Sequence, residues 1–310
     1  MKFQRALSAE VAKEKPFAAI AGGGHRLGHM ISAIQSDAAL LADIHTASAE
    51  PDCLHVWWLG QSGFLLKHGG SFLLLDPYLS DSLTLKYAAT DKPHVRMTER
   101  CIAPESLDFV KLVTSSHQHT DHFDEATLLP LAEKAGAIKL LVPAAEEDRA
   151  RARLDNSAAV ELVPMNDGDS TILDGWWISA VAAAHNEVER DDEGRCKFLG
   201  FVVQKSGFAV YHSGDTLWHP GLVESLLPFF CDLALVPING NKPERRVAGN
   251  LNGTEAAALA KAIGAGLAVP HHFDMFEFNT EPPDEFVSTC ARLSQPCHVL
   301  RCGERLTLKK

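Results

Sequence analysis

Short apolar runs alternate with glycine-rich and polar segments from residue 54 onward. Runs of this length, rich in Val, Leu, Ile and aromatic residues, are typical of buried strands. The pattern predicts strands within residues 55–60, 63–67, 71–76, 109–116, 176–184, 198–205, 207–215, 232–238 and 267–270. Apolar positions at helical spacing predict helices within residues 125–136, 144–154, 222–230 and 254–265.

The order of these elements, strands followed by helices, occurs twice along the chain. Two sheets packed face to face with helices outside would bury both apolar faces, which predicts an α/β fold with four layers, α/β/β/α. Residues 26–48 carry helical spacing ahead of the first strand and predict one or two helices. We therefore expect an N-terminal helical arm over residues 1–50 and the main domain over residues 51–310.

Composition restricts the class of protein. No run approaches the roughly 18 apolar residues that span a bilayer, and charged residues at 10, 13, 14 and 15 interrupt the region where an export signal would lie. The seven cysteines form no C-x-x-C pair, which favours reduced thiols and a cytoplasmic location. A net charge of −11 argues against a nucleic-acid partner. We expect no membrane partner either, and a homo-oligomer stays open.

The segment TSSHQHTDHFD, residues 114–124, places three histidines and two aspartates directly after an apolar run. His117 and His119 would project on the same side if the strand extended through them. Asp121 and His122 follow in the turn before the next predicted helix. The four side chains suit a metal site, but two metals need more ligands than these.

Three other predicted strands end in further donors: His185, Asp215, and the pair His271 and His272. A single histidine at a strand end is more often a structural residue than a ligand. Several such donors, together with the 114–124 segment, instead indicate a metal centre at the strand ends. The spacing alone does not choose between His271 and His272.

The pattern H-x-H-x-D-H, a histidine about sixty residues later, S-G-D-T and a late P-x-H resemble the metallo-β-lactamase superfamily. WLGQSGFLL, DPYLSDSL, SGDTLWHPG and LVPINGN are similar to its L-ascorbate-6-phosphate lactonase branch, over residues 55–278. The resemblance implies the metallo-β-lactamase sandwich and a ligand two residues after Pro270, which is His272. It assigns the metal ligands as His117, His119 and His185 for one ion, Asp121, His122 and His272 for the other, and Asp215 as the bridge. Gln61 stands where the family often has histidine and is not counted as a ligand.

This ligand set implies two divalent ions per chain, of manganese, zinc or iron. The leading hypothesis is a cytoplasmic metal-dependent hydrolase that uses a metal-bridging hydroxide to open a lactone or related ester in a small, anionic, sugar-derived substrate. Asp121 is the catalytic candidate, as the residue that orients the nucleophile or shuttles its proton. Candidate substrate-binding residues are His219, four residues after Asp215, and Arg245 with Arg246, which offer a fork for an anion.

Two alternatives belong to other functional classes. Phosphodiester hydrolysis within the same superfamily would favour a basic exosite or an apolar membrane-facing groove, and the sequence contains neither. A non-catalytic metal-bound scaffold or regulator is disfavoured because the ligand set is complete.

Overall fold

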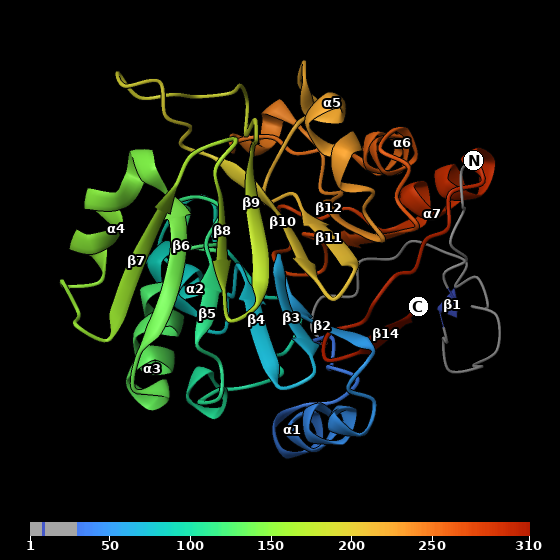
Figure 1. Ribbon diagram of the computed structural model, residues 1–310. Helices are drawn as coiled ribbons and strands as arrows, with labels where there is room; N and C mark the ends of the chain where they lie inside the picture. Colours follow the sequence, from blue (N-terminus) through green and yellow to red (C-terminus); the bar gives the residue numbers. More distant parts are fainter. Residues whose placement is uncertain (1–7, 10–29) are drawn as a thin grey trace.

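The computed structural model describes residues 8–9 and 30–310, and two sheets form its centre (Figure 1). The first sheet has eight strands in the order β1 (Ser8–Ala9), β14 (Arg305–Lys309), β2 (Leu54–Gly60), β3 (Gly63–His68), β4 (Ser71–Leu75), β5 (Leu112–Thr114), β6 (Ile138–Pro143) and β7 (Val160–Met165). The second has six strands in the order β13 (Leu267–His271), β12 (Leu233–Pro237), β11 (Phe208–His212), β10 (Leu199–Lys205), β9 (Trp176–Ala182) and β8 (Ser170–Leu173).

Helices cover the outer side of each sheet (Figure 1). On the first sheet lie α1 (Asp37–Thr46), α3 (Glu125–Ala135) and α4 (Glu147–Arg153); on the second lie α5 (Leu222–Leu226), α6 (Gly253–Ala262) and α7 (Asp284–Leu293). The short helix α2 (Ser82–Tyr87) packs in a smaller apolar cluster. Single 3-10 turns are η1 (Ala47–Ala49), η2 (Pro104–Ser106), η3 (Ala144–Glu146), η4 (Leu227–Phe229) and η5 (Pro243–Arg245). The predicted four-layered α/β/β/α sandwich is confirmed.

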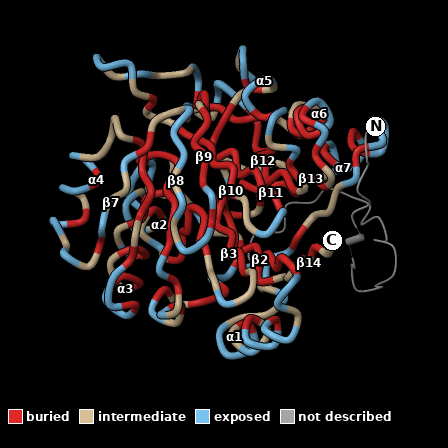
Figure 2. The backbone as a smooth tube through the Cα atoms, viewed as in Figure 1, coloured by how far each residue is buried: buried red, intermediate tan, exposed pale blue. Residues whose placement is uncertain are grey.

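Both faces of β2, a central strand of the first sheet, are buried (Figure 2). In β2, Val56 and Trp58 face the core between the sheets, whereas Trp57 and Leu59 face the helices outside. Successive side chains of a strand point to opposite faces, so a run that is apolar at every position needs cover on both sides. The continuous apolar runs in the sequence therefore reflect a sheet enclosed by two layers.

The prediction for residues 26–48 is only partly correct. Residues 26–29 lie outside the described residues, and residues 30–36 are not helical. Ile31 N donates to Met97 O, and Ile34 N donates to Cys302 O, so backbone bonds to distant segments replace a helical turn. Helix α1 then packs Leu40 into the apolar cluster outside the first sheet, as an integral layer of the fold.

The strand directions bring one set of strand ends together. β4 and β5 run parallel in the first sheet, and β11, β12 and β13 run parallel in the second. The carboxyl ends of parallel strands lie at one edge of a sheet, where α/β proteins build their sites. The predicted ligands of residues 117–122, Asp215 and His272 follow β5, β11 and β13 at such ends, whereas His185 follows β9, which pairs antiparallel with β8 and β10. No helix in the described part of the chain combines the length and hydropathy needed to cross a membrane.

Candidate metal centre

The segment after β5 forms a tight turn. The strand ends at Thr114, so His117 and His119 lie beyond it, and the predicted strand alternation does not apply to them. Instead, the backbone amides of His122 and Phe123 both donate to His119 O. This turn folds the segment back on itself and brings the His117 and His119 rings to a centroid distance of 4.7 Å.

The first group of donors consists of His117, His119 and His185, whose ligand atoms all lie within 4.8 Å of one another. Burial lowers the pKa of His117 well below its usual value and lowers the pKa of His119 to about 4. Burial also lowers the pKa of His185. His185 Nδ1 lies 2.9 Å from Gly249 O and donates to it, so its Nε2 lone pair faces the group. These are neutral imidazoles, the form that binds a metal.

The second group consists of Asp121, His122 and His272. Burial alone would lower the pKa of His272, but the Asp215 and Asp121 carboxylates raise it to about 9. The same carboxylates hold the pKa of His122 well above its usual value. Burial would in turn raise the pKa of Asp121, but the neighbouring His122 and His272 hold it far below. The second group is thus a buried cluster of ion pairs.

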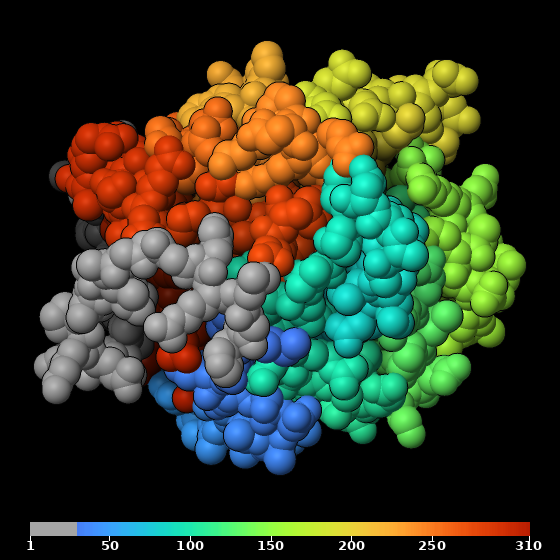
Figure 3. Space-filling model, turned by 180° about the vertical axis from the view of Figure 1, so that it is seen from behind, coloured from blue at the N-terminus to red at the C-terminus, as the bar shows by residue number. Residues whose placement is uncertain are grey.

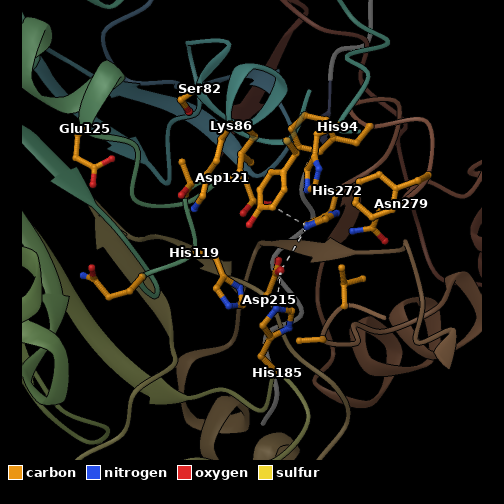
Figure 4. Close-up of a pocket in the computed structure, with 18 of the residues that line it drawn as sticks. Ser82, Lys86, His94, His119, Asp121, Glu125, His185, Asp215, His272 and Asn279 are labelled. Carbon is orange, nitrogen blue, oxygen red and sulfur yellow. Dashed lines mark ion pairs between the residues drawn. The ribbon is translucent and has the colours of Figure 1, made fainter. Parts of the chain in front are cut away.

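Asp215 lies between the two groups. Its Oδ1 is 3.1 Å from His122 Nε2, and its Oδ2 is 3.3 Å from His272 Nε2 and 3.5 Å from His185 Nε2. Figure 4 shows His272 pointing toward both Asp121 and Asp215, with His185 on the other side of Asp215. One carboxylate therefore reaches histidines of both groups.

His117 Nε2 is buried without a hydrogen-bond partner among the described residues, and buried His122 Nε2 and Asp215 Oδ1 lie 3.1 Å apart without forming a well-aligned hydrogen bond. Buried polar atoms are nearly always paired, because an unpaired one loses its hydration without compensation. Two imidazole nitrogens and a carboxylate oxygen that converge in this way are typical ligands of a divalent cation. The residues present therefore fit divalent metal ions.

Asp76, at the end of β4, orients His122 from behind. Its Oδ2 lies 2.8 Å from His122 Nδ1, and its Oδ1 accepts from Thr114 Oγ1 at 2.9 Å. A carboxylate on the far nitrogen of a ligand histidine fixes the ring and directs its other nitrogen to the metal. Sequence reasoning missed Asp76, whose only signal was its place in DPYLSDSL at a strand end.

The structure separates His271 from His272. His271 stacks on His212 with a centroid distance of 5.1 Å, and its Nδ1 lies 3.2 Å from Ser62 Oγ. His272 has a left-handed backbone, with a φ of 61°, and turns its ring toward Asp121 and Asp215. His272 therefore joins a group of side chains that could hold a metal ion, whereas His271 packs behind that group.

A cleft of about 600 Å³ opens over the centre and is lined by His119, Asp121, His185, Asp215 and His272. Its other walls come from α2, from α4 and from the loop after β13. Seen from behind (Figure 3), the cyan segment that contains α2 lies against the orange segment after β13. Backbone bonds join them, from Met97 N to Met275 O and from Glu277 N to Val95 O.

The three candidate substrate-binding residues do not line this cleft. The ring nitrogens of His219 lie 3.0 Å from Pro220 O and 3.1 Å from Ala182 O. Arg245 donates to Asn239 O and pairs with Glu281, and exposed Arg246 pairs with Asp91 at 2.7 Å. Local carbonyl and carboxylate groups satisfy these side chains, and their role in substrate binding stays a prediction.

Two sheets with outer helices, and a histidine and aspartate centre at their shared edge, define a metal-dependent hydrolase of the metallo-β-lactamase fold. The chain belongs to the beta-lactamase superfamily, whose domain model matches residues 72–273. It is 30% identical to a UPF0173 metal-dependent hydrolase of Rubrobacter xylanophilus, over 81% of this chain and 95% of that protein. A relative of the same name from Thermococcus kodakarensis is 27% identical over 82% of this chain and 99% of that protein.

Solved structures share the fold at lower identity. Igni18, a metallo hydrolase from Ignicoccus hospitalis, superposes with a TM-score of 0.60 at 22% identity and covers 83% of this chain and 99% of its own. An isothiocyanate hydrolase from Delia radicum gut bacteria superposes with a TM-score of 0.64 at 18% identity, over 81% of this chain and 98% of its own. The L-ascorbate-6-phosphate lactonase branch stays a prediction.

Proposed function

We propose that this hydrolase holds two divalent ions and opens a lactone, or cleaves a related ester, in a small anionic, sugar-derived substrate. The observation that carries the proposal is the shared Asp215, whose carboxylate lies within 3.5 Å of histidines from both groups. One ion takes about four to six ligands including water. The seven donors together supply enough for two ions that share one carboxylate.

His117, His119 and His185 would hold one ion, and Asp121, His122 and His272 the other. Such ions, when bound, polarise the substrate and lower the pKa of water from about 16 toward about 7, which supplies hydroxide at neutral pH. A ligand set of histidine and aspartate without cysteine suits manganese, iron and zinc.

Asp121 is the candidate catalytic residue. It lines the cleft, and the adjacent His122 and His272 overcome the effect of burial and hold its pKa far below the usual range. A carboxylate that is ionised at neutral pH can orient the attacking water by accepting its hydrogen bond. Asp76, through His122, would keep this arrangement fixed.

Two cations in the cleft wall support an anionic substrate. Exposed Lys86, from α2, has no carboxylate within ion-pair distance among the described residues. Arg149, from α4, is exposed and lies 3.6 Å from Glu146. Arg153, in contrast, is occupied by Glu125 and by the carbonyls of Gln118 and Phe123. Lys86 is therefore the first candidate to meet a carboxylate or phosphate, and Arg149, whose ion pair with Glu146 is long at 3.6 Å, is the second.

The proposal includes a cytoplasmic location, for which the seven free cysteines are the support. It includes neither a nucleic-acid nor a membrane partner, and self-association stays open.

The test is elemental analysis of the purified protein, followed by hydrolysis assays on sugar-phosphate lactones, simple lactones, phosphodiesters and β-lactams. We expect about two equivalents of metal and turnover of an anionic lactone. Rapid turnover of phosphodiesters with inert lactones would replace lactone opening by the phosphodiesterase alternative. Metal binding without any hydrolysis would favour the scaffold.

A further inference from the structure

We propose that Gln61 is a further ligand of the second metal position, through its side-chain amide oxygen. The inference rests on the proposed dinuclear centre and adds a donor to the group of Asp121, His122 and His272. Gln61 lies in the turn between β2 and β3 and is only 1% exposed.

The backbone of Gln61 is tied to the backbone of a ligand. Its carbonyl oxygen accepts from His272 N at 3.1 Å and from Trp58 Nε1 at 3.0 Å. The His272–Gln61 backbone hydrogen bond therefore fixes the distance between the β2–β3 turn and the turn after β13. Because of this tie, the side chain of Gln61 starts from a defined position beside His272.

The end of the Gln61 side chain lies at the donor atoms of the second group. Its Nε2 is 2.8 Å from Asp121 Oδ2 and 3.0 Å from His272 Nε2, and these two atoms are 3.4 Å apart. A carboxamide has a donor and an acceptor of nearly equal size, and a half-turn exchanges them. Toward a carboxylate it presents N–H; toward a cation held by that carboxylate it presents its oxygen.

The backbone conformation of Gln61 is unusual for a glutamine. Gln61 has a φ of 49°, in the left-handed region that favours glycine and asparagine. Strained conformations of this kind persist where the surrounding structure holds a residue for a function.

An amide oxygen would change the character of the second position. The first group is made of three imidazoles, whereas the second already has a carboxylate and shares Asp215. A neutral oxygen ligand increases the number of hard donors without adding a negative charge. The second position would then favour a harder ion such as Mn²⁺ more than the first does.

Mn²⁺ binding to the full-length protein, stripped of metal by a chelator and measured by equilibrium dialysis, tests the inference. Gln61→Asn tolerates the left-handed backbone but shortens the side chain, and should weaken the second Mn²⁺ by about tenfold or more. Gln61→Glu keeps the length of the side chain and adds a negative charge, so it should tighten binding of the second Mn²⁺. The first Mn²⁺ should bind as in the wild type in both variants. Gln204→Leu, in β10, is the control and should leave both ions unchanged.

Co²⁺ in place of Mn²⁺ gives a second readout, because its visible absorption reports the ligands around each ion. The bands of the second Co²⁺ should change in Gln61→Asn and not in the control. A wild type that binds fewer than two ions would overturn the dinuclear centre, and the inference with it. Two ions in the wild type, with wild-type affinities and spectra in Gln61→Glu and Gln61→Asn, would overturn the role of Gln61 alone. If Gln61→Asn does not fold by circular dichroism, the near-isosteric Gln61→Glu decides.

Discussion

The two halves of the metal centre differ in charge although both are built from buried histidines. In the first group, burial lowers the pKa of all three imidazoles: His117, His119 and His185. In the second group, carboxylates outweigh burial and raise the pKa of His122 and His272. The difference comes from position, because only the second group has its own aspartate and an outer carboxylate, Asp76, behind it.

This contrast has a consequence for metal binding. A neutral imidazole accepts a cation without losing a proton, whereas a protonated one must release it first. The first position should therefore bind metal over a wider range of pH than the second. The second position is where protons and metal compete for the same nitrogen atoms.

Loss of Asp215 should have the largest effect, because this residue contacts both groups. We expect Asp215→Ala to retain neither ion and to lower kcat/KM by more than about 100-fold. Loss of a residue that only supports a metal ligand costs about 10- to 100-fold, and Asp215 contacts the donors of both groups itself. Elemental analysis and a hydrolysis assay measure the two effects. An Asp215→Ala protein that kept full activity would contradict the shared-carboxylate centre.

Single-ligand variants of each group compare the two halves directly. His185→Ala should lose the ion of the first group, and His272→Ala the ion of the second, so that each variant retains about one equivalent. Both should lose most of their turnover. Loss of both ions from either variant would mean that the two positions do not bind independently. Metal content per chain, measured on the same preparations as activity, distinguishes these outcomes.

Asp76→Asn tests the outer carboxylate that distinguishes the second group. We expect affinity at the second position to fall by about 10- to 100-fold, with the first position unchanged, since His122 alone loses its partner. Asp167→Asn, which removes a carboxylate from the distant pair with Arg190, is the matched control. Equal losses at both positions would show that Asp76 supports the fold rather than His122. Titration of the stripped protein with Mn²⁺ gives the affinities.

The pH dependence of the metal-free protein should reveal the ion pairs of the second group. The pKa of His272 is raised from 6.5 to about 9, so its contribution to stability is complete below pH 6.5 and is lost as pH rises through 9. The melting temperature in the presence of a chelator should therefore fall over this interval. In His272→Ala the fall should be smaller. Thermal denaturation followed by circular dichroism measures the melting temperature of both proteins. If it fell equally with pH in the wild type and in His272→Ala, His272 would not be the source of the pH dependence.

Lys86→Met should have the smallest effect. The side chain is exposed, so the loss should be about 1 kcal/mol or less, seen as a few-fold rise in KM for an anionic substrate with kcat unchanged. A neutral substrate should be unaffected. Lys139→Met, away from the cleft, is the control. A fall in kcat for the neutral substrate would assign Lys86 to the centre rather than to the substrate's charge.

The sequence predicts the fold class and the donor residues that the structure brings together. Those donors could be found because each stands at or just after the end of an apolar run. It was insufficient where tertiary contacts decide. Asp76 and Gln61 look like ordinary turn residues until His122 and His272 come against them. His94 carried no signal at all, yet it stacks on Tyr87 at 4.2 Å in the cleft wall.

Local bonding explains the other differences. Arg245 was chosen as a substrate contact from its charge and loop position, but its pairing with Glu281 depends on a segment distant in sequence. Residues 30–36 have helical spacing, yet their amides bond to residues 97 and 302. Periodicity cannot register such long-range partners.

Strand β14 has a consequence for how the molecule is made. It lies beside β2 in the first sheet, with Arg305 opposite Trp57, although almost the whole domain separates the two in sequence. During synthesis, β2 leaves the ribosome long before β14 exists to pair with it. One edge of the nascent sheet must therefore wait unpaired, in the state most open to mispairing with other chains. Completion of the sheet therefore depends on a contact that forms late in synthesis.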